Sequence, residues 1–284
     1  MAETSNGVAA KLLEQFDVHR TAALHQGWLA LGYASIQPAT GLSLLENYLK
    51  AVHPNATPPW SGLLLWRFYQ YSKDKSLVRR QMAGWYAKIT EQHQQYYNWY
   101  DPLEEGLPAL DGRQDPRWLT ALTWSNESLL RIGHLLGEDV SAILHWHELT
   151  IYTMNAKLWD EACGAYRTYD LSHQTLQPAA GLDGFLPLAA EVPVQAQAER
   201  MLHRLEKSLF TQPISLLDGW LLWEGLRRYE LRDCAMHVRR FLLKAVHEHG
   251  FYETFDGATG LPVGSAAGPL AAALYLLLSK AAQK

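Results

Sequence analysis

A glutamate flanked by aromatic residues lies near the end of the chain, in the stretch Gly250–Gly260 (GFYETFDGATG). Glu253 follows Tyr252, and Gly257 and Gly260 predict that this segment turns between two apolar helical stretches. A carboxylate in such a place is well positioned for chemistry on a bound substrate, because loops often carry catalytic groups. The alternative is an ordinary surface turn with a solvated acid.

Tryptophan is unusually frequent, with 11 residues in the chain, and several lie near expected loops or beside polar residues. An indole ring packs against the C–H face of a pyranose while its N–H bonds a hydroxyl group, so tryptophans often line carbohydrate pockets. With Tyr252, four of them are candidate sugar-binding residues: Trp28, Trp60, Trp118 and Trp220. The alternative is that they fill the core, because aromatic side chains bury large areas wherever they lie.

Signatures of other chemistries are missing from the sequence. It has no glycine-rich phosphate loop, no Gly-x-Ser-x-Gly elbow and no Cys-x-x-Cys pair. His145 and His147 are two residues apart, so on a helix they point in different directions and cannot easily share a metal ion. We therefore expect neither a metal nor a cofactor.

Several short motifs resemble those of glycoside hydrolase family 63, which includes mannosylglycerate and glucosylglycerate hydrolases and is related to trehalases. The stretch around Glu253 is similar to the family's FYE-x-(Y/F)-(D/N)-x-x-T-G segment. The other motifs follow the family's order: Asn126–Gly137 (NESLLRIGHLLG), Leu158–Tyr166 (LWDEACGAY), Leu186–Leu188 (LPL) and Gly225–Tyr229 (GLRRY). By this resemblance the chain is a shortened and divergent member of the group.

The resemblance implies an inverting mechanism with two carboxyl groups, one that protonates the leaving group and one that activates water. It makes Glu253 the general base, with Tyr252 shaping the pocket beside it. Departures from the family pattern remove polar groups that would hold substrate. Leu29 stands where the family has a sugar-contacting Asp, and Thr57 replaces the glutamine of its Q-P-P step.

The general acid of the family is the Asp of E-S-G-x-D-N-S-P-x-W, and the corresponding stretch here runs from Glu104 to Trp118. That position holds Pro108 or Arg113, depending on which end is aligned. If the loop has been rebuilt, Asp111 is the candidate acid, and the next candidates are Asp115 and Glu105. The alternative is that all three are exposed loop charges.

Apolar residues recur at helical spacing almost throughout the chain, which predicts an all-α fold. The expected helices lie at about 20–35, 40–52, 59–72, 75–99, 117–136, 140–158, 196–209, 215–229, 235–246 and 267–282. Asp139 is an expected N-cap, Gly250 an expected helix stop, and no β-hairpin is predicted. The resemblance adds an (α/α)6-type toroid of helical hairpins, with shortened loops or one hairpin missing.

Length and composition predict a single (α/α) barrel domain over 1–284, since no stretch reads as a linker. The net charge of -4 gives no electrostatic case for binding nucleic acid or an anionic membrane. Met1–Gly7 is polar, no apolar run is long enough to span a membrane, and Cys163 and Cys234 are too few for a disulfide framework. We expect a cytoplasmic protein whose partner is a small carbohydrate.

Two functions remain open. The first is an inverting α-glycosidase that hydrolyses a small α-glucoside or α-mannoside, either a glycosylglycerate or a disaccharide. The second is a non-catalytic relative that binds carbohydrate or acts as a scaffold after losing the general acid. Other (α/α) barrel enzymes, such as sugar epimerases, usually rely on histidine bases, which the sequence does not locate.

Overall fold

The computed structural model describes residues 2–15, 23–52, 58–101, 103–208, 211–266 and 268–280, so Thr57 lies outside the described residues. The contacts divide the chain into two compact units. Unit 1 comprises Met1–Ala51, Arg67–Val78 and Leu205–Lys284, and unit 2 comprises Val52–Trp66 and Arg79–Arg204. Each unit is described by itself, and the single domain over 1–284 stays a prediction.

Both units are built mainly of helices. Unit 1 contains α1 (Ala2–Gln15), α2 (Ala23–Tyr33), α3 (Pro38–Ala51), α9 (Leu216–Arg228), α10 (Arg232–His249) and α11 (Pro269–Lys280). Unit 2 contains α6 (Pro116–Leu136), α7 (Ser141–Thr153), a π-helical turn (Met154–Leu158) and a 3-10 helix (Asp183–Ala190). The residues of α4 (Ser61–Tyr71), α5 (Lys75–Tyr100) and α8 (Gln195–Ser208) are shared between the units.

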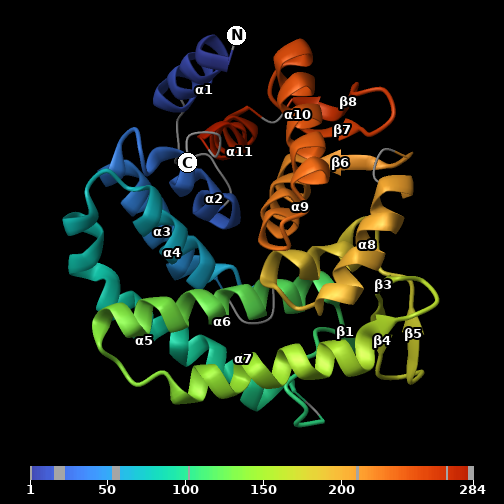
Figure 1. Ribbon diagram of the computed structural model, residues 1–284. Coiled ribbons are helices and arrows are strands. Elements are labelled where there is room, and N and C mark those ends of the chain that lie inside the picture. The colour runs from blue at the N-terminus through green and yellow to red at the C-terminus, as the bar shows by residue number, and fades with distance from the viewer. Residues whose placement is uncertain are drawn as a thin grey trace. The chain divides into compact units, whose positions relative to one another are not determined.

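Within unit 1, α9 is an inner helix and α10 packs along it (Figure 1). Residues 219–226 of α9 are all buried, whereas α10 buries only one stripe, Ala235, Val238, Leu242, Ala245 and Val246. A helix buried all round belongs to a core, and one with a single apolar stripe covers it. The Leu242 side chain of α10 packs directly on Gly219, where a Cβ atom would lie 2.1 Å from Leu242 Cδ1.

Within unit 2, α6 is the corresponding inner helix and packs against α7 and the 3-10 helix. It begins at the N-cap Asp115 with Pro116 in the first turn, and it ends at Gly137, whose φ of 77° is left-handed. Its middle approaches the start of α4 at Gly62, whose N–H donates to Ser125 Oγ at 2.7 Å. A Cβ atom on Gly62 would lie 2.6 Å from the Ser125 carbonyl oxygen, so only glycine fits there.

Short antiparallel sheets join the helices. In unit 1, β6 (Pro213–Ser215), β7 (Tyr252–Asp256) and β8 (Pro262–Ala266) form a sheet in that order. In unit 2, β1 (Arg113–Gln114), β4 (Thr168–Asp170) and β5 (Thr175–Gln177) form a second sheet, and β2 (Trp159–Asp160) pairs with β3 (Ala165–Tyr166).

The predicted helices are confirmed within a few residues at their ends, with three differences. The helix expected over 140–158 changes to a π-helical turn after Thr153, and neither α1 nor the 3-10 helix Asp183–Ala190 was predicted. The N-cap of α7 is Val140 and not the expected Asp139, although Asp139 Oδ1 accepts a hydrogen bond from the Ser141 N–H at 2.9 Å. The expectation that the chain has no β-hairpin is wrong, because β4–β5 and β7–β8 are both hairpins.

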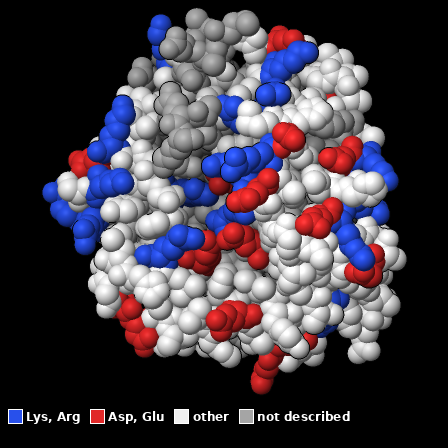
Figure 2. Space-filling view, viewed as in Figure 1, with Lys and Arg blue, Asp and Glu red and all other residues white. Residues whose placement is uncertain are grey.

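The surface carries both signs of charge. On the face shown in Figure 2, acidic and basic side chains lie intermixed. Among the described residues, no helix combines the length and the apolar character needed to cross a bilayer.

Candidate active site

Glu253 lies on a strand rather than in a loop. It is the second residue of β7, and the turn between β7 and β8 is closed by Asp256, whose Oδ1 accepts hydrogen bonds from the N–H groups of Ala258 and Thr259 at 3.2 and 2.8 Å. Glu253 is half-buried, and no hydrogen bond or ion pair to its carboxylate is found among the described residues. The carboxylate is thus held on a strand, without a hydrogen-bond or ion-pair partner among the described residues.

A β-bulge lies directly opposite Glu253. Tyr252 pairs with Ala266 and Thr254 pairs with Val263, so one residue of β7 faces two residues of β8. The first of these two, Gly264, has a φ of 85°, a left-handed conformation that glycine adopts without strain. Bulges of this kind often lie beside active sites, where they redirect a side chain. The bulge therefore marks Glu253 as the position at which the sheet departs from regular pairing.

The strand partner on the other side of β7 leads into α9. Ser215 pairs with Thr254 and is the N-cap of α9, where its hydroxyl accepts a hydrogen bond from the Asp218 N–H at 3.0 Å. The sheet thereby places α9 directly after the strand that pairs with β7. Tyr252 is half-buried on β7, with its ring edge-on to Phe255.

The candidates Trp28 and Trp220 pack against each other in unit 1. Their ring centroids are 5.6 Å apart in an edge-on arrangement, and they are 4% and 0% exposed. These two rings lie in the core of the unit in this structure, so their contact with a sugar stays a prediction. The guanidinium of Arg67 lies over the Trp220 ring, 5.9 Å from its centroid.

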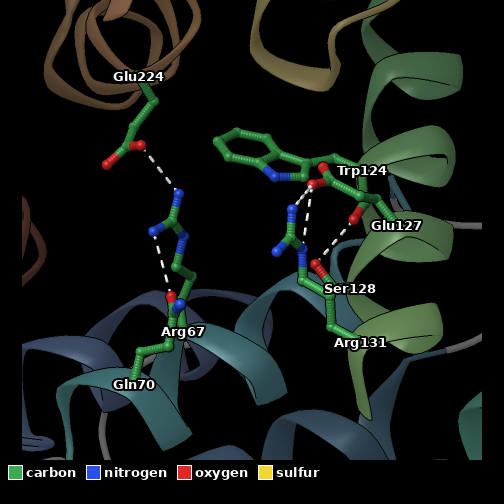
Figure 3. Close-up of polar contacts among 7 residues, drawn as sticks. All are labelled: Arg67, Gln70, Trp124, Glu127, Ser128, Arg131 and Glu224. Atoms are coloured by element: carbon green, nitrogen blue, oxygen red, sulfur yellow. Dashed lines mark hydrogen bonds and ion pairs between the residues drawn. The ribbon is translucent and has the colours of Figure 1, made fainter. Parts of the chain in front are cut away.

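Arg67 forms a buried ion pair that the sequence reasoning missed. Its Nη2 lies 2.9 Å from Glu224 Oε2, its Nη1 donates to Gln70 Oε1 at 3.2 Å, and the two charged side chains are only 15% and 9% exposed (Figure 3). Trp220 and Glu224 are one turn apart on α9, so they share a face of that helix. Burial of the neighbouring Tyr71 raises its pKa. An available signal was that Arg67 and Glu224 each stand among apolar residues in their helix.

In unit 2, the structure brings Asp111 and Trp118 to one cavity of about 400 Å³. Its lining residues are Pro58, Leu110, Asp111, Arg113, Asp115, Arg117 and Trp118. The Trp118 ring is 5% exposed and is held edge-on by Tyr96, with centroids 5.2 Å apart. Its indole nitrogen is buried and has no hydrogen-bond partner among the described residues. The last candidate, Trp60, is 5% exposed before the first turn of α4 and does not line this cavity.

Asp111 is at the tip of a tight turn. Leu110 and Arg113 exchange both backbone hydrogen bonds at 2.9 Å, and the two residues between them, Asp111 and Gly112, have φ values of 50° and 73°. Two successive positive φ values define the hairpin turn for which Asp-Gly is a preferred pair. The Asp111 side chain is exposed, so it can reach a ligand in the cavity.

The other two candidate acids already have structural roles. Asp115 caps α6 by accepting from the Trp118 N–H at 3.1 Å, and its second oxygen accepts from Thr168 Oγ1 at 3.3 Å. Glu105 forms an ion pair with Lys157 and accepts from Gln114 Nε2 at 2.7 Å. Of the three carboxylates, Asp111 is therefore the most available for catalysis. No cluster of three or more potential metal ligands is found among the described residues.

Comparisons with known proteins agree with the sequence resemblance. Residues 111–216 match a family model described as a mannosylglycerate hydrolase MGH1-like glycoside hydrolase domain. The chain is 30% identical over 200 residues to the mannosylglycerate hydrolase of Rubrobacter radiotolerans, a match that covers 61% of this chain and 45% of that protein. It is 27% identical over 178 residues to the Thermus thermophilus mannosylglycerate hydrolase, with coverages of 55% and 43%. The chain spans less than half the length of these curated relatives.

Solved structures show the same fold. The GH63 mannosylglycerate hydrolase from Thermus thermophilus in complex with Tris and D-glycerate superposes with a TM-score of 0.87 at 17% identity, covering 96% of this chain and 99% of that chain. A GH78 rhamnosidase of Bacillus superposes with a TM-score of 0.64 over 91% of this chain and 31% of that one. The all-α, (α/α)6-type fold is confirmed. The chain is thus similar to glycoside hydrolase family 63 proteins, in sequence over part of its length and in fold.

Proposed function

We propose that the chain is an inverting α-glycosidase that hydrolyses a small α-mannoside or α-glucoside, with a glycosylglycerate as the first choice and a disaccharide as the second. The observation that carries the proposal is Glu253, which is half-buried, without an ion pair among the described residues, and opposite the Gly264 bulge. The choice of substrate rests on the relatives, which are mannosylglycerate hydrolases.

Each carboxylate has one task in this mechanism. Glu253, as the ionised base, takes a proton from a water molecule while that water attacks the anomeric carbon. Asp111, as the protonated acid, gives its proton to the oxygen of the leaving group, and the α-linkage is converted to a β-configured product.

The cavity beside Asp111 favours an anionic leaving group. Arg113 is exposed and lines the cavity, so its guanidinium can pair with the carboxylate of a glycerate. Arg117, the other arginine that lines the cavity, forms an ion pair with Asp183 at 2.7 Å. Arg113 is therefore the arginine that is better able to turn toward a ligand. A neutral disaccharide makes no use of that charge.

We further propose that the enzyme works in the cytoplasm. Cys163 and Cys234 are both free thiols, as a reducing compartment leaves them. Burial raises the pKa of the Cys234 thiol to about 11, so that residue stays protonated and unreactive at neutral pH.

The first experiment is hydrolysis of mannosylglycerate, glucosylglycerate and trehalose by the purified protein, followed by proton NMR of the released sugar. We expect the β-anomer to appear first, and the two charged substrates to be cleaved better than trehalose. Glu253→Gln should lower kcat by about 10² to 10⁴ while substrate binding persists, because the amide cannot accept the proton from water. Initial release of the α-anomer, or turnover by Glu253→Gln at the wild-type rate, would contradict the proposal.

A further inference from the structure

A continuous chain of buried and partly buried hydrogen bonds runs through unit 2 and ends on the segment that precedes Asp111. His93 Nδ1 lies 2.6 Å from Asn126 Oδ1, and Asn126 Nδ2 lies 2.8 Å from the Tyr97 hydroxyl. That hydroxyl lies 2.8 Å from Thr150 Oγ1, which donates to the Gly106 carbonyl oxygen at 2.7 Å. The chain thus joins α5, α6 and α7 to the loop that follows α5.

The last contact determines which group donates in each hydrogen bond of the chain. Because a carbonyl oxygen only accepts, Thr150 donates its single hydroxyl hydrogen to the Gly106 carbonyl oxygen. Tyr97 must therefore donate to Thr150. Tyr97 then has no hydrogen left for Asn126, so the amide nitrogen of Asn126 donates to Tyr97. The amide oxygen of Asn126 therefore faces His93, whose Nδ1 must carry the proton.

The surroundings of His93 agree with this tautomer. Its side chain is 1% exposed, and its Nε2 has no hydrogen-bond partner among the described residues, as expected for an unprotonated nitrogen. Burial lowers the pKa of His93 to about 4, so the ring is neutral at physiological pH. Asn126 is also the first residue of the sequence motif Asn126–Gly137. Its hydrogen bonds to His93 and Tyr97 give it a structural role that does not require contact with a substrate.

The end of α7 and the π-helical turn that follows it contact the loop that the chain reaches. Thr150 and Thr153 of α7 and Lys157 of the π-helical turn follow one another at about one-turn spacing, and each contacts residues 105–106. Thr153 Oγ1 donates to the Glu105 carbonyl oxygen at 2.8 Å, and Lys157 pairs with the Glu105 carboxylate. Leu149 packs so closely on Gly106 that a Cβ atom there would lie 2.6 Å from Leu149 Cγ.

The opposite side of the loop is tied to α5 and to the Asp111 hairpin. Asp101 accepts from the Gly106 N–H at 2.6 Å and from the Glu105 N–H at 3.2 Å. Gln114, the second residue of β1, donates through Nε2 to Glu105 Oε1 and to the Leu107 carbonyl oxygen at 2.7 and 2.9 Å. Because Gln114 directly follows the turn at Asp111, the position of the loop is coupled to the position of that turn.

We propose that His93, Asn126, Tyr97 and Thr150 are positioning residues, which fix the Glu105–Leu107 loop and through it the Asp111 turn. The proposal that they serve catalysis rests on the proposed function, in which Asp111 is the general acid. None of the four need touch substrate, since the effect is transmitted by the Gly106 carbonyl and by Gln114.

The experiment uses two variants that break the chain and two matched controls. Thr150→Val and Tyr97→Phe remove one hydroxyl each with little change in shape. Thr150→Ser keeps the hydroxyl, and Tyr86→Phe removes the hydroxyl of another buried tyrosine of α5 that is outside the chain. Hydrogen exchange of the peptide that contains Glu105–Leu107 is measured for all four, together with kcat and KM for mannosylglycerate.

We expect exchange at Glu105–Leu107 to be accelerated about tenfold or more in Thr150→Val and Tyr97→Phe, because local opening becomes easier. Their kcat should fall about 10- to 100-fold with little change in KM, since a misplaced acid acts mainly in the transition state. Thr150→Ser and Tyr86→Phe should behave as the wild type. Unchanged exchange in Thr150→Val overturns the positioning role. Faster exchange with an unchanged kcat overturns the proposal that this positioning assists catalysis.

A second measurement does not depend on activity. Nitrogen-15 NMR of the histidine side chains, with His93→Phe to assign the signal, should show His93 as the Nδ1–H tautomer from pH 7 to pH 5. The Nε2–H tautomer overturns the direction of the chain. If the wild type cleaves no α-glycoside, both the proposed function and the proposal that the four residues assist catalysis fail. The exchange and tautomer measurements still test whether the hydrogen-bond chain fixes the Glu105–Leu107 loop.

Discussion

Arg67 and Glu224 are single charges inside two apolar helical stretches, and they lie 157 positions apart in the sequence. Taken alone, each charged residue only interrupts the apolar face of its helix. Their pairing appears only when α4 and α9 are brought together, because nothing local in either helix specifies the partner. The same limit applies to Asp111 and Trp118, which share a cavity that the spacing of the two residues does not predict. The Asp111-Gly112 pair, in contrast, is a preferred pair for a hairpin turn, a local signal that the prediction of no β-hairpin passed over.

The buried pair should matter for stability far more than an exposed one. Glu224→Gln leaves the Arg67 charge without its counter-ion in a site that is 15% exposed, so we expect the free energy of unfolding to fall by about 2 to 4 kcal/mol. The matched control is Glu127→Gln on α6, whose partner Arg131 is 54% exposed and whose pair spans one helical turn (Figure 3). There we expect a loss of about 0.5 kcal/mol or less. Urea unfolding measures both, and equal losses would show that burial of the pair is not what stabilises it.

At the scale of elements, the helices were predictable and the strands were not. The period of 3.6 residues repeats several times over a helix such as α6 or α10, so its apolar stripe can be read from the sequence alone. The strands are two to five residues long, too short for an alternating pattern to stand out. β7 also depends on β6, a partner about 40 residues earlier in the chain, and such pairing is set by the tertiary structure.

The hairpin of β7 and β8 allows a direct test of how Glu253 is presented. Gly264→Ala introduces a Cβ atom where φ is 85° and no atom lies within 4 Å, so the cost is backbone strain of about 1 kcal/mol and not a clash. We expect the bulge to relax toward regular pairing, which redirects Glu253 and lowers kcat about tenfold or more with a smaller change in KM.

Gly260→Ala is the matched control for the bulge variant. Gly260 lies in the turn of the same hairpin with a φ of 73°, and a Cβ atom there meets only an ordinary contact at 3.9 Å from Phe241. It should therefore cost similar stability in thermal unfolding while leaving kcat close to the wild-type value. If both variants lose activity equally, general strain in the hairpin explains the loss and the bulge has no special role.

At the scale of the whole molecule, stability should depend on pH through His93. The pKa of His93 is about 4 in the folded protein and about 6.5 in an unfolded chain, so the unfolded state takes up a proton first as the pH falls. Stability is therefore complete above about pH 6.5, declines between about pH 6.5 and 4, and loses up to about 3 kcal/mol over that range. Unfolding free energies from denaturant titrations at several pH values measure this.

Two histidine variants separate His93 from the other titrating groups. His93→Gln keeps a donor for Asn126 but does not titrate, so the decline between pH 6.5 and 4 should become shallower by one proton. His134→Gln replaces an exposed histidine of α6 and should leave the slope as it is in the wild type. A slope that is the same in all three proteins would show that His93 contributes nothing to it.

The contact between Gly62 and Ser125 described above bears on any effort to improve this protein by directed evolution. A saturation library at position 62 should return glycine alone among folded clones, since even a methyl group would collide with the α6 backbone. Arg113 and its neighbours around the cavity are better positions to randomise. Exposed side chains there can be replaced without disturbing the contact between α4 and α6 at Gly62.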